Sequence, residues 1–167
     1  SLGWSEQAGG FPYSTIGLPV RDLHKRVGSL AEGYAHVVID TPPGNGDRAI
    51  TRSALMAVEQ AIVPVAPSTM DINRFQATLD LLAEVDDLHT LTYRVLLTRV
   101  RSNTRSSRDI RDLLAEDEIP TFATEIPTFA TEIPLLEAYA NAYGTTPTNT
   151  TAERYAAAIC ELMGVHS

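Results

Sequence analysis

Hydrophobic and polar positions alternate along the chain between short apolar runs and longer stripes with helical spacing. Three apolar runs of strand length, residues 37–39, 61–66 and 93–98, are rich in valine, isoleucine and leucine, which is typical of buried parallel strands. Between and around them, apolar residues recur every three to four positions and predict helices. These helices cover residues 23–31, 48–58, about 71–85, 108–116, 135–143 and the stretch from 150 onward.

This alternation of strands and helices predicts an α/β fold, a three-layer α/β/α sandwich with a mostly parallel sheet. Local signals support the helix ends. Asp71 is suited to cap the start of one helix, and Gly144 is suited to end another. Residues 150–153, Thr-Thr-Ala-Glu, form a capping-box pattern at the start of the last helix.

Residues 118–134 contain a seven-residue unit in tandem, EIPTFAT-EIPTFAT-EIP. Seven is odd, so successive copies along a strand present their side chains to opposite faces of a sheet. A proline in every copy excludes a coiled coil, because proline breaks helix interiors. We interpret the repeat as a duplicated edge-strand segment whose extra copy is bulged out or lengthens a loop.

Composition limits the class of protein. A chain of 167 residues can form one α/β domain with a core, but not two ordinary ones. No apolar run approaches the roughly 18 residues of a membrane span, and the N-terminal residues do not resemble a signal peptide. The single cysteine, Cys160, cannot form an internal disulfide, which is typical of a cytoplasmic protein without a membrane anchor.

Charge is unevenly distributed. The net charge of -8 argues against a protein that coats nucleic acid with its whole surface. However, six of the 13 basic residues lie between Arg94 and Arg111. Four of them are candidates for neutralising DNA phosphates: Arg101, Arg105, Arg108 and Arg111. The alternative is a solvated helix face, with Asp109 and Asp112 as local ion-pair partners.

Residues 36–47 read HVVIDTPPGNGD and carry the clearest candidate chemistry. A buried strand that ends in Asp40 would place a carboxylate where α/β folds bind ligands. That carboxylate could hold Mg²⁺ through water. Pro42 and Pro43 stiffen the following loop, and Gly44 lets backbone N–H groups approach a phosphate. Taken alone, the pattern also fits an Asp that caps the next helix.

The string VVIDTPPG closely resembles the Walker B and switch II segment of the ParA/MinD superfamily of deviant P-loop ATPases. Three further stretches resemble this family in its order: SALMAVEQAIVPVAPSTMDI, VLLTRV and IPLLEAYANAYGTTPT. The resemblance covers the chain from about residue 33 onward. It is greatest to ParA-type ATPases of plasmid and chromosome partition.

The resemblance implies a site for ATP and Mg²⁺. Asp40 would be the Walker B carboxylate beside Mg²⁺. Thr98 and Arg99 would lie near the adenine, although many relatives have Asn in place of Thr98. The switch II loop would consist of Thr41, Pro42, Pro43 and Gly44. Pro134 would begin the loop on the other side of the base, with Pro127 and Pro120 as the alternatives that the repeat offers.

The phosphate-binding loop of the family is absent from these 167 residues. No GxxxxGK[ST] motif occurs, and Lys25 is the sole lysine, whereas this class grips phosphate with a Gly-rich loop and a lysine. We therefore expect residues 1–167 to form a single partial ATPase domain without the first βαβ unit. Residues 1–32 would follow switch I, and residues 33–167 would run from Walker B to the C-terminal helix. By itself such a chain should be marginally stable and without ATPase activity.

For the intact family, the resemblance implies a homodimer formed on ATP binding, nonspecific DNA binding, a ParB-type partner and a cytoplasmic location on the nucleoid. An alternative is a degenerate interaction module that keeps the scaffold without nucleotide. A biosynthetic member of the superfamily would need substrate-binding insertions that the sequence does not contain. Iron-protein and arsenite-pump relatives depend on cysteines that it lacks.

Overall fold

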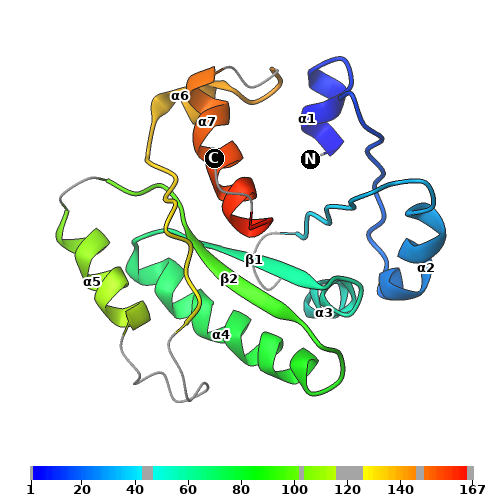
Figure 1. Cartoon of the computed structure of the whole chain (residues 1–167), viewed down its shortest axis with the longest axis horizontal. Helices are drawn as coiled ribbons and strands as arrows, with labels where there is room; N and C mark the ends of the chain where they lie inside the picture. Colours follow the sequence, from blue (N-terminus) through cyan, green and yellow to red (C-terminus); the bar gives the residue numbers. More distant parts are fainter. Residues whose placement is uncertain (1, 43–46, 102–103, 116–125, 146–148, 165–167) are drawn as a thin grey trace.

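The computed structural model describes residues 2–42, 47–101, 104–115, 126–145 and 149–164. In this part of the chain, helices and strands alternate from α3 to α5, as the sequence predicts (Figure 1). None of the helices described is long and apolar enough to cross a membrane. The elements are α1 (Leu2–Gln7), α2 (Leu23–Leu30), α3 (Arg48–Leu55), β1 (Gln60–Val65), α4 (Thr69–Asp86), β2 (Thr92–Leu97), α5 (Arg105–Ala115), α6 (Glu137–Asn141) and α7 (Asn149–Leu162).

The sheet is built around β2. On one side β2 pairs in parallel with β1, from Gln60 opposite Thr92 to Val65 opposite Leu97. Helix α4 connects the two strands, so β1, α4 and β2 form the βαβ unit that parallel pairing requires. On its other side β2 faces residues 126–135, which make isolated parallel bridges to Val95 and Val100.

Pro64 lies on the outer edge of β1. The carbonyls of Glu59 and Val65 accept hydrogen bonds from the N–H groups of Thr92 and Thr98, at 3.0 and 2.8 Å. Backbone groups alternate in direction along a strand, so residue 64 has the opposite parity and faces away from β2. A proline offers no N–H to a neighbouring strand there, which is typical of edge strands. Among the residues described, β1 is therefore an edge of the sheet.

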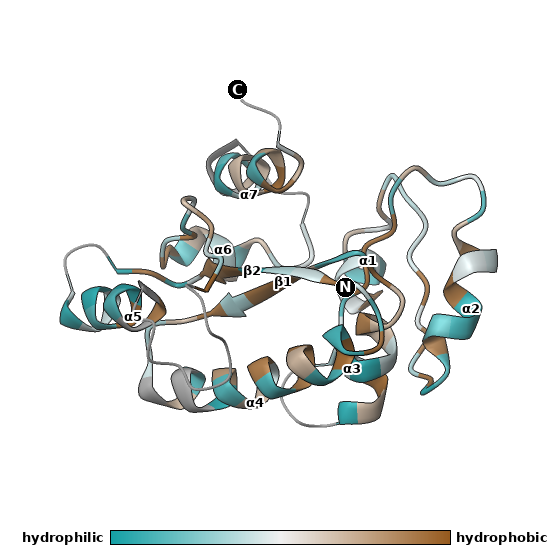
Figure 2. Ribbon diagram, turned by 60° about the horizontal axis from the view of Figure 1, so that its bottom comes forward, coloured by the Kyte–Doolittle hydropathy of each residue, from teal (hydrophilic) through white to brown (hydrophobic). Residues whose placement is uncertain are grey.

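Helices lie on both faces of this small sheet (Figure 2). The larger core lies between the sheet and helices α4 and α5, and includes Val95, Leu97, Leu79, Val85 and Ile110. The smaller core lies on the opposite face, under α7, and consists of Leu96, Phe129, Ile133 and Ala158. The described residues thus form an α/β fold with a two-stranded parallel sheet, rather than the complete sandwich that the sequence predicts.

The strand predicted at residues 37–39 does not form. Val38 is 92% exposed, and residues 37–39 belong to no strand or bridge. Valine and isoleucine favour an extended backbone, but a strand also needs a neighbour to satisfy its N–H and C=O groups. In the described part of the chain no segment pairs with these residues, so the apolar run stays unpaired.

Helix starts are displaced where hydroxyl groups cap them. The N-cap of α4 is Ser68 and not Asp71, because the Ser68 hydroxyl accepts the N–H of Asp71 at 3.2 Å. The same hydroxyl donates to the Asp71 carboxylate at 2.8 Å, which fixes the orientation of the cap. Likewise α5 begins at Arg105, three residues before its predicted start.

The seven-residue repeat behaves in the sheet as its odd length predicts. Ile126 and Ile133 occupy equivalent positions in successive copies, and each is 2% exposed. Ile126 belongs to the larger core and Ile133 to the smaller one. The two isoleucines therefore point to opposite faces of the sheet, as the alternation of side chains along a strand requires. The copy at 118–124 lies outside the described residues.

Glu161 of α7 fastens the segment 126–135 to the sheet. Its carboxylate accepts the backbone N–H groups of Ala130 and Thr131 at 2.8 and 2.9 Å. It also forms an ion pair with Arg94 of β2, whose guanidinium lies over the ring of Phe129, 4.2 Å from its centroid. Together these residues form a clamp (Arg94, Phe129, Ala130, Thr131, Glu161) between β2, the repeat and α7.

The environment of Glu161 favours its ionised form. Burial, the largest single influence, raises the pKa, but hydrogen bonds from Ala130 and Thr131 and the charge of Arg94 together lower it below its ordinary value. A carboxyl whose pKa is lower in the folded state stabilises the fold above its unfolded pKa, and this contribution is lost as the pH falls through the folded pKa.

Replacing Glu161 by glutamine should therefore destabilise the chain by about 1–3 kcal/mol at neutral pH, because a charged acceptor of two backbone N–H groups is lost. The difference from the unsubstituted chain should shrink as the pH falls below the model-compound value of 4.5. Urea denaturation across pH measures both effects. Glu153→Gln, on the exposed side of the same helix, should change stability by less than about 0.5 kcal/mol.

Candidate functional site

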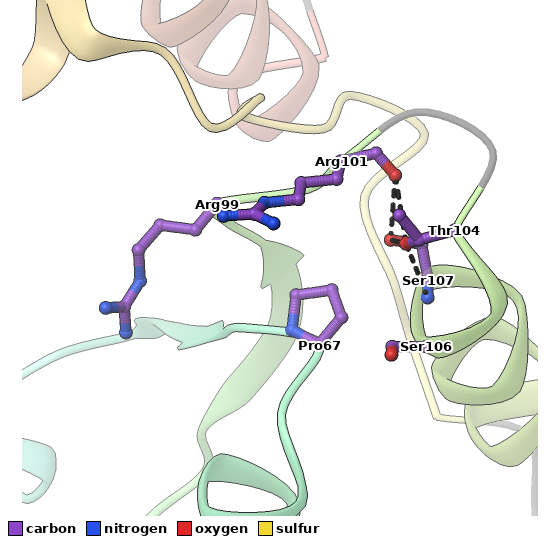
Figure 3. Close-up of a pocket in the computed structure, with 6 residues that line it drawn as sticks. All are labelled: Pro67, Arg99, Arg101, Thr104, Ser106 and Ser107. Atoms are coloured by element: carbon purple, nitrogen blue, oxygen red, sulfur yellow. Dashed lines mark hydrogen bonds between the residues drawn. The ribbon is translucent and has the colours of Figure 1, made fainter.

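A pocket lies where the carboxyl ends of β1 and β2 meet the start of α5 (Figure 3). It encloses about 220 Å³. In parallel α/β sheets, ligands bind at this end of the strands, because loops there leave backbone groups and helix N-termini facing outward. Its lining consists of Pro67, Arg99, Arg101, Thr104, Ser106 and Ser107.

Hydroxyl groups order the wall of the pocket formed by α5. The carbonyl of Arg101 accepts hydrogen bonds from the hydroxyls of Thr104 and Ser107, at 3.2 and 3.1 Å. The hydroxyl oxygens of Thr104 and Ser107 lie 2.9 Å apart, and that of Thr104 accepts the Ser107 N–H at 3.4 Å. Ser107 is only 1% exposed, so its hydrogen bonds are largely shielded from water and hold Arg101 beside the first turn of α5 (Figure 3).

Arg99 lines the pocket with a positively charged side chain, and its backbone is left-handed. Its φ is 53°, the one positive φ among non-glycine residues in the part of the chain described. The side chain is 67% exposed and lies 3.6 Å from the carboxylate of Asp71. A left-handed conformation costs a residue with a Cβ about 1–2 kcal/mol. The neighbouring residue Val100 is held on both sides, since its N–H donates to Ile133 and its carbonyl accepts from Leu135.

The residues predicted to flank a base lie close to this pocket. Thr98 donates both its N–H and its hydroxyl to the carbonyl of Val65, at 2.8 and 3.4 Å. Pro134 bridges to Val100, whereas Pro127 lies further down β2, where its carbonyl accepts from Val95. Pro134 therefore lies at the carboxyl end of the sheet, beside Val100, the residue that follows Arg99. Pro120 lies outside the described residues.

The predicted metal and phosphate-sensing residues are separate from the pocket. Asp40, Thr41 and Pro42 are exposed and do not line it. Pro43 and Gly44 lie outside the described residues. In the described ranges, no group of three or more His, Cys, Asp or Glu side chains is arranged to hold a metal ion. A Mg²⁺ ion bound through water and nucleotide phosphates does not need such a group.

The basic residues predicted to contact DNA differ in what surrounds them. Arg105 is 93% exposed, with Asp109 at 3.8 Å, and Arg101 and Arg108 are also exposed. Arg111 instead makes two hydrogen bonds of 2.6 and 2.7 Å to the carboxylate of Glu132, which raises its pKa. Arg111 thus links α5 to the repeat, while the other three leave most of their charge facing solvent.

Four residues of the pocket were missed by reasoning from sequence: Pro67, which follows β1, and the three hydroxyl residues Thr104, Ser106 and Ser107. A signal was present, because the polar loop RSNTRSS precedes a helix and Thr104 is followed three residues later by another hydroxyl. Hydroxyl residues at that position are typical N-caps. The helix was expected to start later, which placed these side chains in an unordered loop.

No protein-family model matches the chain. Among curated proteins, it is 28% identical over 83 residues to the Maintenance of carboxysome distribution protein A of Synechococcus elongatus; the match covers 50% of this chain and 32% of that protein. The chain thus spans about a third of this relative.

Among solved structures, the fold matches a plasmid partition protein from Borrelia burgdorferi with a TM-score of 0.58 and 16% sequence identity. The match covers 98% of this chain and 58% of the other. At this level of identity the similarity concerns the fold alone. It extends over nearly all of the chain, including the pocket end of β1 and β2.

Two substitutions at Arg99 should distinguish the energetic cost of its left-handed backbone from the effect of its charge. Both Arg99→Gly and Arg99→Ala remove the guanidinium, but only glycine relieves the left-handed backbone. We expect the glycine variant to be more stable by roughly 0.5–1 kcal/mol, after allowing for the flexibility glycine adds to the unfolded chain. Urea denaturation measures this difference.

Arg101 provides the matched control, because its φ is not positive. There the order should reverse, with Arg101→Gly less stable than Arg101→Ala. If Arg99→Gly is also less stable than Arg99→Ala, the left-handed backbone at Arg99 stores no strain.

Proposed function

The chain is a relative of the ParA/MinD-type proteins, and we propose that it is part of an ATPase that partitions or positions large cargo such as plasmids or chromosomes. The observation that carries this proposal is the pocket at the carboxyl ends of β1 and β2, with Arg99 and Arg101 in its wall. This is the end of a parallel sheet at which nucleotides bind.

The base of the nucleotide would enter between Arg99 and the segment at Pro134. A guanidinium can stack on a base or bind a phosphate with several donors, and both arginines of the pocket are exposed. The wall at Thr104 and Ser107 supplies ordered hydroxyls next to the N-terminus of α5, whose partial positive charge favours anions. These features suit the polar, anionic character of ATP.

The phosphate end of the nucleotide would involve Asp40 and the loop from Thr41 to Gly44. A carboxylate in this position would hold Mg²⁺ through water, and Mg²⁺ would bridge to the phosphates. Gripping the phosphates also takes a glycine-rich loop with a lysine, which these 167 residues do not contain. We propose that the intact site needs that loop, and that residues 37–39 join a neighbouring strand only in a larger three-layer sandwich.

Nonspecific DNA binding would use the exposed arginines at the start of α5. Arg101, Arg105 and Arg108 lie on one loop and the first turns of the helix, so they can reach neighbouring phosphates. Arg111 would contribute through the part of its side chain that Glu132 leaves exposed. The remaining features of the family, an ATP-dependent homodimer, a ParB-type partner and a cytoplasmic location on the nucleoid, are proposed on the relationship alone.

A second candidate is an interaction module that keeps this scaffold without binding nucleotide. It is favoured by the separation of Asp40 from the pocket and by the absence of a lysine-bearing phosphate loop from the sequence. The two candidates differ in whether the pocket binds an adenine nucleotide, so they can be distinguished by experiment.

Nucleotide binding can be followed by titrating the isotope-labelled chain with AMP and with ATP in the presence of Mg²⁺. If the pocket holds the base, backbone amide signals of Thr98, Arg99, Arg101 and Leu135 should shift with both ligands, while those of α2 should not. ATP should bind little more tightly than AMP, because these 167 residues lack the loop that would bind the additional phosphates. Unchanged signals at millimolar nucleotide would favour the interaction module.

ATP hydrolysis by the 167-residue chain should equal that of a protein-free blank. The reason is electrostatic, since no lysine and glycine-rich loop are available to stabilise charge on the transferred phosphoryl group. Release of inorganic phosphate is the measurement, with Asp40→Ala as a control that should give the same rate. Turnover of an ordinary ATPase, lost in Asp40→Ala, would contradict this expectation.

DNA binding should weaken when Arg105 and Arg108 are both replaced by glutamate. Because each phosphate contact releases about one counterion, the slope of log K against log salt should fall by about two. Fluorescence anisotropy with a random-sequence duplex at several salt concentrations measures this. The matched control replaces two exposed basic residues on other helices, Lys25→Glu on α2 and Arg154→Glu on α7, and should change affinity much less. Equal losses in the two variants would indicate only a general effect of net charge.

A further inference from the structure

The ten residues 118–127 and the ten residues 125–134 have the same sequence, EIPTFATEIP. The structure seats residues 126–134 of the second stretch beside β2. We infer that the position beside β2 can be filled in two registers seven residues apart, so that the chain exists as two folded forms with the same sheet. This inference is independent of the proposed nucleotide site.

Apart from the bond that Leu135 donates to Val100, the backbone and side-chain contacts described for this segment involve residues of the repeated unit. The N–H of Val95 donates to the carbonyl of Pro127 at 2.8 Å. The N–H groups of Phe129 and Ile133 donate to the carbonyls of Val95 and Leu97, each at 2.9 Å. Val100 donates in turn to the carbonyl of Ile133 at 3.1 Å. Each of these bonds depends on a backbone group that an identical residue seven positions earlier also has.

The side-chain contacts repeat in the same way. Glu161 binds the N–H groups of Ala130 and Thr131, and Arg111 binds Glu132. The partners of the segment, such as Arg94, Arg111 and Glu161, occur once in the chain and lie outside the repeat. They would therefore meet the same residue types in the second register.

In the second register, each place in the sheet would be taken by the residue seven positions earlier. Ile126 would move from the larger core to the place of Ile133 in the smaller core. Ordinarily a shift by an odd number of residues puts the wrong side chains on each face. Here the residues that replace them are identical: Ile119 for Ile126, Phe122 for Phe129, Ile126 for Ile133 and Pro127 for Pro134.

Only the connections distinguish the two registers. The seven extra residues precede the segment in one register and follow it in the other, so the total length of connecting chain is unchanged. The entropy of closing a loop depends on its length only logarithmically. In the observed register the N–H of Leu135 donates to the carbonyl of Val100 at 2.8 Å. In the second register the N–H of Thr128 would take its place. Neither register is therefore strongly favoured.

Ile126 and Ile133 offer a matched test, because both are isoleucines with 2% exposure. Ile126 occupies a core in both registers, whereas Ile133 does so in only one. Ile126→Ala should therefore change the unfolding equilibrium constant by on the order of 30-fold or more, as truncations of buried isoleucine do. Ile133→Ala should change it by only about two-fold, because the other register remains intact.

The double variant Ile119→Ala, Ile133→Ala damages both registers. It should be destabilised as strongly as Ile126→Ala, although each single substitution costs about two-fold. This strong non-additivity, measured by urea denaturation of the full chain, is the expected result. The inference is overturned if Ile133→Ala is as destabilising as Ile126→Ala, Ile119→Ala has no effect and the double variant equals Ile133→Ala.

Fluorine NMR on the unsubstituted chain, labelled with fluorophenylalanine, provides a second readout that requires no core truncation. Phe122 and Phe129 exchange places between registers, so each should give two signals whose intensities report the populations. Phe75, which is 4% exposed in α4, should give one signal and serves as the internal reference. Phe122→Leu and Phe129→Leu assign the signals. A single signal for Phe129 and a single different one for Phe122 would also overturn the inference.

Discussion

The ion pair between Arg94 and Glu161 joins three segments that are far apart in the sequence: β2, the repeat and α7. Glu161 also accepts two backbone N–H groups at 2.8 and 2.9 Å, where residues 130 and 131 leave the regular pairing with β2. A charged acceptor stabilises these partly exposed N–H groups, so the carboxylate supports the segment where it departs from the pairing with β2. Ile126 and Ile133 flank this stretch and lie on opposite faces of the sheet.

The pocket depends on this arrangement through Val100. The backbone of Val100 is bonded on both sides to residues of the 133–135 stretch, which holds the chain where it leaves β2. Arg99, immediately before it, keeps its left-handed backbone because its neighbours are constrained. The two arginines of the pocket therefore owe their position to a segment whose sequence occurs twice. A change of register would supply equivalent bonds to Val100 and alter the connections that join the segment to α5 and to α6.

The arginines between residues 94 and 111 show how one basic stretch can serve different purposes. Arg94 and Arg111 make short contacts with carboxylates of other elements, which couple β2 to α7 and α5 to the repeat. Arg99, Arg101, Arg105 and Arg108 remain exposed, and these four leave most of their charge to attract phosphate. In sequence the six residues are equivalent, because local spacing carries no information about which carboxylate a long side chain reaches.

By itself, the sequence determined the order of strands and helices from residue 48 onward, the odd-period alternation of the repeat and the relationship to ParA/MinD-type proteins, because these depend on local periodicity and on short motifs. Only the tertiary structure decided that residues 37–39 stay outside the sheet and which arginines face solvent. Those outcomes depend on partners distant in the chain: a strand needs a neighbour for its backbone groups, and an ion pair needs a carboxylate within reach.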